Sequence, residues 1–138
     1  MTTTLDLDAL LQVAKESAEQ AYAPYSKYHV GSAVLTDKGV FSGFNIENAS
    51  TPLGICAERA AMVNARIHGA MAIHAVAIWC RDASTGEDGV LNPETMPCGA
   101  CRQWIAELAP DARIVTNGTG GRSFTIDELL PYGFRLPV

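Results

Sequence analysis

Three cysteines constrain this sequence more than any other feature. Cys98 and Cys101 lie three residues apart in the segment PCGAC, where Pro97 marks the expected start of a helix. Residues three apart lie on one face of a helix, so both thiols can bind one ion. A helix start also stabilises thiolates through its dipole and its free N–H groups, and the thiolate is the form that binds metal. This pair therefore predicts part of a metal site.

A third thiol comes from Cys56, in the segment ICAER. It falls in the first turn of a helix expected over 56–68, so two helix starts can converge on one ion. Structural zinc usually has four protein ligands, whereas catalytic zinc keeps its fourth position for water. No fourth cysteine or histidine follows at short spacing. We therefore predict one zinc ion per chain, bound by Cys56, Cys98 and Cys101. The alternative is that these cysteines are buried apolar thiols.

The next two residues with chemistry are Glu58 and Arg59. In the first turn of its helix, Glu58 can point towards the open side of the metal. A site with three thiolates is negatively charged and acidifies its water less than a site with three histidines, and a neighbouring carboxylate can take the proton of that water and return it elsewhere. Arg59 can offset the excess thiolate charge. The alternative is that Glu58 is a solvated acid at a helix start.

Charge and composition exclude several classes of protein. The net charge of -5 disfavours nucleic-acid partners, whose affinity depends on lysine and arginine at phosphates, so a small substrate is expected. No apolar stretch approaches the ~20 residues that span a bilayer, and the first residues lack a signal peptide. We expect a cytoplasmic protein without membrane contact. In that reducing compartment the cysteines favour metal binding over disulfides. The fourth, Cys80, is expected to be a core thiol.

No repeat or linker divides the chain, so residues 1–138 are expected to form a single domain. Hydrophobic spacing predicts helices over 7–21, 56–68 and 98–108, with a short last helix over 127–130. Strands are predicted over 30–37, 40–46, 74–80, 113–117 and 123–126, the last at a sheet edge. A hairpin followed by alternating strands and helices indicates a three-layer α/β/α sandwich with a mixed five-stranded sheet.

The sequence resembles the small zinc-dependent cytidine deaminases of pyrimidine salvage over nearly its whole length. Five segments carry the resemblance in the family's order: AYAPYSKYHVGSAVL, GFNIENAS, ICAERAA, PCGACRQ and DELLP. It implies hydrolytic deamination of cytidine or deoxycytidine, with zinc on the three cysteines and Glu58 as proton shuttle. It implies that Asn45 and Glu47 hold the ribose, that the backbone of Ala57 contacts the base, and that Tyr28 lies against the nucleoside.

The resemblance also implies an assembly. Family members of this size are typically homotetramers whose sites include residues of neighbouring chains, and Phe134 matches such a residue. The small side chains of Ala60 and Ala61 are expected to let helices of two chains approach closely.

Some positions depart from the family pattern. Thr51 stands where tyrosine is usual, Gly54 where threonine is usual, and His29 where proline is usual, while the loop 81–97 is longer. The smaller side chains at positions 51 and 54 leave more space at the rim of the expected substrate pocket. This predicts tolerance of substituents on the exocyclic N4 or near the 5′ end of the nucleoside. The alternative is that the longer loop or an aromatic side chain fills the space.

Other functions remain open at this point. One is deamination of a modified cytosine nucleoside, as in the blasticidin-S deaminases, although Asn45 and Glu47 favour an ordinary ribose and those enzymes lack the pair. Another is a structural zinc module, which requires a closed site with four ligands. The net negative charge of the chain disfavours a deaminase that edits nucleic acids.

Overall fold

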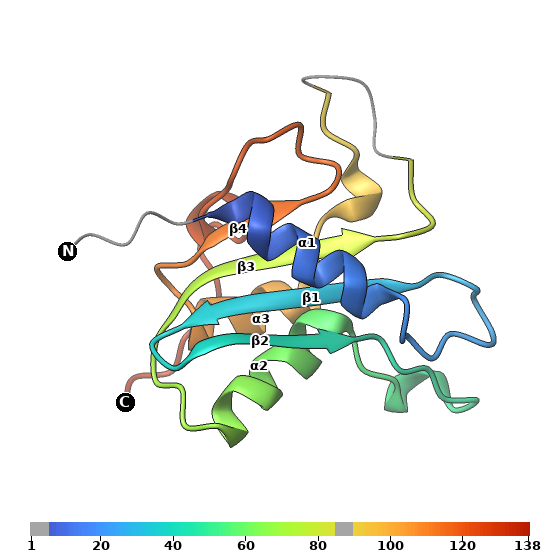
Figure 1. Cartoon of the computed structure of the whole chain (residues 1–138). Helices are drawn as coiled ribbons and strands as arrows, with labels where there is room; N and C mark the ends of the chain where they lie inside the picture. The colour runs from blue at the N-terminus through green and yellow to red at the C-terminus, as the bar shows by residue number, and fades with distance from the viewer. Residues whose placement is uncertain (1–5, 85–89) are drawn as a thin grey trace.

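A four-stranded mixed sheet forms the centre of the computed structural model, which describes residues 6–84 and 90–138. Strands β1 (Val30–Thr36) and β2 (Gly39–Phe44) form an antiparallel hairpin. Strand β3 (Ile73–Cys80) pairs antiparallel with β1, and β4 (Arg113–Thr116) runs parallel to β3. The strand order is therefore β2-β1-β3-β4 (Figure 1).

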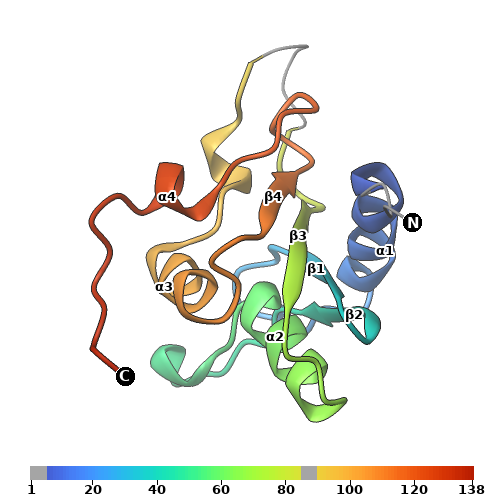
Figure 2. The ribbon, with the colours of Figure 1, turned by 90° about the vertical axis from the view of Figure 1, so that its left-hand side faces the viewer.

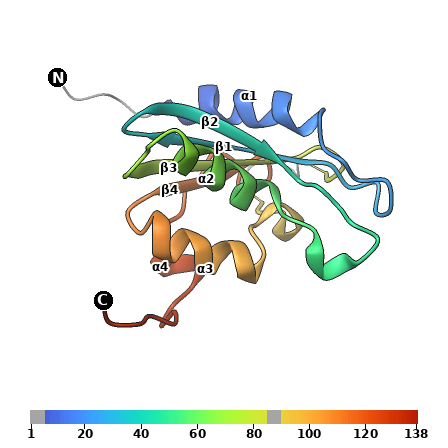
Figure 3. The same ribbon diagram turned by 90° about the horizontal axis from the view of Figure 1, so that it is seen from below.

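Helices cover both faces of the sheet, as expected for a three-layer sandwich. Helix α1 (Leu7–Ala18) lies on one face, and α2 (Ala57–Ile67), α3 (Gly99–Leu108) and α4 (Ile126–Leu129) lie on the other (Figures 2 and 3). Side chains of β3 alternate between the two layers, because successive residues of a strand point to opposite faces. Ala75 and Ala77 pack in the cluster under α1, whereas Val76 and Ile78 pack in the larger cluster under α2 and α3.

Two glycines let helices lie directly on the sheet. A Cβ atom at Gly31 would lie 2.0 Å from the carbonyl oxygen of Ala14 in α1, and one at Gly43 would lie 2.3 Å from the backbone nitrogen of Ala61 in α2. Only glycine permits such contacts. Ala61 is therefore fully buried against β2, so the prediction that it faces a helix of another chain is wrong.

The predicted fifth strand over 123–126 is also wrong, because the described residues contain a four-stranded sheet. The segment forms one isolated bridge, in which Phe124 and Ile114 exchange two backbone hydrogen bonds of 2.8 Å. The next residue, Thr125, already caps α4: its hydroxyl accepts from the backbone N–H of Glu128, whose carboxylate accepts from the N–H of Thr125. This capping box turns the chain into a helix before pairing can continue.

Helix α1 ends at Ala18, three residues earlier than expected, because the chain after it joins the site. The N–H of Tyr22 donates to the carbonyl oxygen of Asn45 at 2.9 Å, and the N–H of Glu47 donates to the carbonyl oxygen of Tyr22 at 2.8 Å. These bonds attach the segment after α1 to residues 45–47, which follow β2. None of the described helices has the length and apolar character needed to cross a bilayer.

Candidate active site

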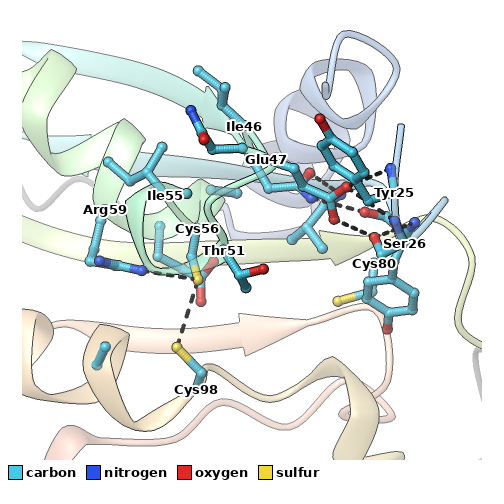
Figure 4. A pocket seen from close by; sticks show the side chains of 18 of the residues that line it. Tyr25, Ser26, Ile46, Glu47, Thr51, Ile55, Cys56, Arg59, Cys80 and Cys98 are labelled. Atoms are coloured by element: carbon cyan, nitrogen blue, oxygen red, sulfur yellow. Dashed lines mark hydrogen bonds between the residues drawn. The ribbon is translucent and has the colours of Figure 1, made fainter. Parts of the chain in front are cut away.

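Three thiols meet where two helices begin. Cys56 is the N-cap residue of α2, Cys98 is the N-cap residue of α3, and Cys101 lies in the first turn of α3. Their sulfur atoms all lie within 4.8 Å of one another, and those of Cys56 and Cys98 are 3.7 Å apart (Figure 4). Zn–S bonds of about 2.3 Å in a tetrahedral site place two sulfur atoms ~3.8 Å apart. We call these three cysteines the thiol cluster, and its spacing fits zinc.

The thiol cluster has three members among the residues that the structure describes. A structural zinc site would normally supply a fourth protein ligand, so this arrangement has the composition of a catalytic site with one position left for another ligand. The closed four-ligand site that a purely structural zinc module requires does not form from residues 6–84 and 90–138.

Positive charge compensates the thiol cluster. The Nη2 atom of Arg59 donates to the sulfur of Cys56 at 3.3 Å, as Figure 4 shows. A hydrogen bond from the thiol of Cys101, with Arg59 acting in the same direction, lowers the pKa of Cys56 well below that of a free thiol, and the same bond raises the pKa of Cys101. Contact with the thiolate in turn raises the pKa of Arg59, so the guanidinium stays charged. Cys56 is thereby held in the anionic form that binds metal.

Glu58 lies beside the thiol cluster in the first turn of α2 and is only 4% exposed. Burial raises the pKa of Glu58 to about 7, and the negative charge of Cys56 acts in the same direction. A carboxyl group with a pKa near neutrality can both accept and donate a proton, which is the property required of a general acid and base. The solvated helix-start acid considered above does not describe this buried residue.

A cleft of about 980 Å³ opens at the thiol cluster. One end contains Cys56, Glu58 and Cys98, and the segment Asn45–Glu47 forms another wall. This segment is fixed because Ile46 exchanges two backbone hydrogen bonds of 3.0 Å with Ile55, the residue before Cys56. The end of β2 is thus tied directly to the start of α2, and this pairing brings Asn45 and Glu47 to the site.

Glu47 is held as an anion at the wall of the cleft. Its Oε1 accepts from the backbone N–H groups of Tyr25 and Ser26 at 3.0 and 3.1 Å, and its Oε2 accepts from the hydroxyl of Ser26 (Figure 4). The bond from the Ser26 hydroxyl is the largest cause of the lowered pKa of Glu47. Sequence analysis missed Tyr25 and Ser26, because their role depends on a backbone turn that no spacing rule reveals.

Asn45 braces the neighbouring wall. Its Oδ1 accepts from the N–H of Val30 at 2.9 Å, and its Nδ2 donates to the carbonyl oxygen of Tyr28 at 2.9 Å. Tyr28 lines the cleft, and its hydroxyl lies 3.4 Å from the carbonyl oxygen of Glu94. Burial raises the pKa of Tyr28. Cys80 is buried, as expected of a core thiol, yet it also lines the cleft beside Tyr28.

Of the two remaining predicted site residues, one lines the cleft and the other does not. Ala57 is buried at the start of α2 and lines the cleft. Phe134 does not line it: this side chain is 69% exposed and lies in a separate groove on α3, where its carbonyl oxygen accepts from Nε2 of Gln103 at 2.9 Å. Within one chain, the structure therefore does not bring Phe134 to the thiol cluster.

Two departures from the family pattern differ in their surroundings. Thr51 lines the cleft near Cys56 (Figure 4). A Cβ atom at Gly54, in contrast, would face the backbone, 3.2 Å from the carbonyl oxygen of Ile46. The absence of a side chain at Gly54 therefore accommodates backbone packing, whereas Thr51 shapes the rim. Part of the longer loop, residues 85–89, lies outside the described residues.

Comparison with known proteins identifies the family. A family model of the cytidine and deoxycytidylate deaminase zinc-binding region matches residues 5–117. The chain belongs to this family. The family model and the thiol cluster together fit one Zn²⁺ per chain.

Relatives match this family member over almost its full length. It is 40% identical over 134 residues to a cytidine deaminase of Halalkalibacterium halodurans, covering 94% of this chain and 95% of the relative. The crystal structure of cytidine deaminase from Mycobacterium tuberculosis superposes with a TM-score of 0.81 at 35% identity, covering 96% of this chain and 100% of the other. A blasticidin-S deaminase of Bacillus cereus is 31% identical over 124 residues, covering 88% of this chain and 87% of the relative.

Proposed function

We propose that this chain is a zinc-dependent hydrolase that deaminates cytidine and deoxycytidine to uridine and deoxyuridine. One observation carries the proposal: Cys56 and Cys98 of the thiol cluster and the buried Glu58 line the same cleft as the ionised carboxylate of Glu47. A cleft of about 980 Å³ is large enough for a nucleoside. The family relationship supports the same activity.

In the proposed reaction, Glu58 moves the protons. Zinc, when bound by Cys56, Cys98 and Cys101, supplies a nucleophile by lowering the pKa of a water molecule. Glu58 accepts the proton that this water loses and delivers it to N3 of the cytosine ring as C4 is attacked. Glu58 then takes the remaining proton of the water, now on the C4 hydroxyl, and delivers it to the exocyclic amine. The amine leaves as ammonia while the C4 carbonyl forms. Burial suits Glu58 to this task because its pKa lies near neutrality.

The other residues bind and orient the nucleoside. Glu47, held by Tyr25 and Ser26, is proposed to accept hydrogen bonds from ribose hydroxyls, with Asn45 contributing at the same wall. Tyr28 is proposed to lie against the nucleoside, and the backbone at Ala57 to contact the base. Arg59 offsets the thiolate charge.

The proposed working form is a homotetramer in the cytoplasm that acts in pyrimidine salvage, with residues 1–138 forming one domain in each chain. Exposed apolar side chains at both ends of α2 support an assembly: Leu53, just before the helix, is 72% exposed, and Ile67, its last residue, is 75% exposed. In such an assembly, Phe134 is proposed to contact the cleft of a neighbouring chain.

A second candidate is deamination of a modified cytosine nucleoside. The likeness to a blasticidin-S deaminase favours it, since the match covers most of both chains. The ionised Glu47 beside Asn45 favours an unmodified ribose instead.

An ultraviolet assay on a panel of cytosine nucleosides tests both candidates, provided zinc content is measured on the same sample. We expect turnover of cytidine and deoxycytidine together with about one zinc per chain. Turnover of blasticidin S without turnover of cytidine would select the second candidate. Zinc without turnover of any panel member would contradict both.

A further inference from the structure

Two buried hydroxyl groups pair at the segment that precedes Cys98 in the chain. Thr95 is fully buried and Thr116 is 2% exposed, and their Oγ1 atoms lie 2.6 Å apart. Thr95 ends the short 3-10 helix η2 (Pro93–Thr95), three residues before Cys98, and Thr116 ends β4. The reaction proposed above uses neither hydroxyl.

The pair belongs to a closed ring of hydrogen bonds. The Thr95 hydroxyl donates to the carbonyl oxygen of Asn92 at 2.8 Å, so the Thr116 hydroxyl donates to Thr95. The Oγ1 atom of Thr116 accepts from the N–H of Gly118 at 3.0 Å. The N–H of Asn92 donates to the carbonyl oxygen of Gly118 at 2.8 Å, which closes the ring. We call Asn92, Thr95, Thr116 and Gly118 the hydroxyl ring.

The hydroxyl ring joins the segment before Cys98 to the rigid sheet. The side chain of Asn117 bonds both backbone groups of Cys80 in β3, at 3.0 Å each, so the end of β4 is fixed to its neighbouring strand. Gly118 and Thr95 are closely packed: a Cβ atom at Gly118 would lie 2.4 Å from Oγ1 of Thr95. Displacing Thr95 from the sheet would therefore also break its buried hydrogen bonds, which is costly.

The opposite side of the same segment is fixed by a separate group. Nε of Arg102 donates to the carbonyl oxygen of Pro97 at 2.8 Å, and Nη1 donates to that of Leu129 at 2.7 Å. Cys98, by contrast, is an exposed N-cap residue without a side-chain cap bond of its own. Its carbonyl oxygen accepts from the N–H of Arg102 at 2.9 Å, so α3 holds Cys98 on one side and the segment before it holds Cys98 on the other.

We infer that Thr95 and Thr116 are positioning residues for the zinc ligand Cys98. They hold the η2 segment against β4, and thereby hold the sulfur of Cys98 at bonding distance from a metal shared with Cys56. Zinc–ligand distances tolerate changes of only about 0.2 Å, so a small shift of this segment weakens binding. The inference rests on the zinc assignment proposed above.

The test measures metal release in Thr95→Val and Thr116→Val, which keep the side-chain volume and remove the hydroxyl. We expect the zinc-loaded variants to transfer zinc to a chelator at least about 10-fold faster than the unmodified chain, the range typical of lost outer-shell bonds. Cobalt-substituted variants should show altered cobalt–thiolate absorption bands. Thr116→Ser, which keeps the hydroxyl, should restore both the release rate and the spectrum.

Thr36→Val is the matched control, because Thr36 is a buried threonine whose hydroxyl donates to the carbonyl oxygen of Gly39 in the β1–β2 turn. We expect it to lower thermal stability without changing zinc release or the cobalt spectrum. Release from both ring variants at the unmodified rate would overturn the inference. Equal acceleration by Thr36→Val, or failure of both ring variants to fold, would also overturn it, since the hydroxyls would then serve general stability. Failure of the zinc assignment itself is distinct, because the unmodified chain would then contain no zinc.

Discussion

The sulfur of Cys56 lies 3.7 Å from the sulfur of Cys98, although 42 positions separate the two residues in the chain. Each cysteine caps a different helix, so this contact exists only because α2 and α3 begin at the same place under the sheet. The separation matches that of two thiolates sharing one tetrahedral zinc ion. Metal content and turnover therefore provide direct tests of the site.

Cys98→Ala should lose most of its zinc, because two thiolates bind the ion far more weakly than three. Metal analysis of the purified variant measures this. Cys80→Ala is the control: Cys80 is a buried thiol outside the thiol cluster, so its zinc content should stay at one per chain. Full zinc occupancy in Cys98→Ala would contradict the ligand assignment.

Glu58→Gln should keep the zinc and the fold but lower kcat by about 10²–10⁴-fold, because an amide cannot transfer a proton. Steady-state assays with cytidine, alongside metal analysis, check both parts. Glu107→Gln, an exposed change on α3, should leave kcat unchanged. A Glu58→Gln enzyme that kept a tenth of the activity would refute the proton-transfer role.

Phe134 provides a test of the assembly, because in its own chain it lies in a groove away from the cleft. Phe134→Ala should raise KM for cytidine, and light scattering of the unmodified protein should report a tetramer. Leu136→Ala, an exposed apolar change in the same tail, should leave KM unchanged. A catalytically competent monomer would rule out the proposed tetramer.

Mixed assemblies sharpen that test. Co-expressed Glu58→Gln and Phe134→Ala chains should form mixed tetramers. In these, the Glu58→Gln chain still has Phe134 and supplies it to the cleft of the Phe134→Ala chain, which still has Glu58. The kcat/KM per Glu58 should then exceed that of the Phe134→Ala tetramer alone. No gain on mixing would show that Phe134 does not act on a neighbouring chain.

Thr51→Tyr tests substrate breadth, because Thr51 lines the cleft where the family usually has the larger tyrosine. We expect the ratio of kcat/KM for N4-methylcytidine to that for cytidine to fall by about 10-fold or more as the rim closes. Leu53→Tyr is the control, since Leu53 lies in the same short 3-10 turn but is not among the residues that line the cleft. An unchanged ratio in Thr51→Tyr would mean that the rim does not select substrates.

The sequence by itself determined the local features of this protein. The spacing of Cys98 and Cys101 predicted a thiol pair at a helix start, and the nearly continuous apolar run over 74–80 predicted a strand covered on both faces. Such features depend on contacts between residues close in the chain, so pattern and spacing are sufficient. The position of Glu58 close to Cys56 is also a local feature, because the two residues lie two positions apart in the chain.

Only the tertiary structure decided the long-range features. It ended the predicted fifth strand at Phe124, because the capping box at Thr125 starts a helix instead. It buried Ala61 against Gly43, where sequence analysis predicted a contact between chains. It also placed Glu47 on the backbone N–H groups of Tyr25 and Ser26. The capping box itself is local, since Thr125 and Glu128 lie three residues apart. The burial of Ala61 and the hydrogen bonds of Glu47 depend instead on atoms distant in the chain, which meet only when the sheet and helices pack together.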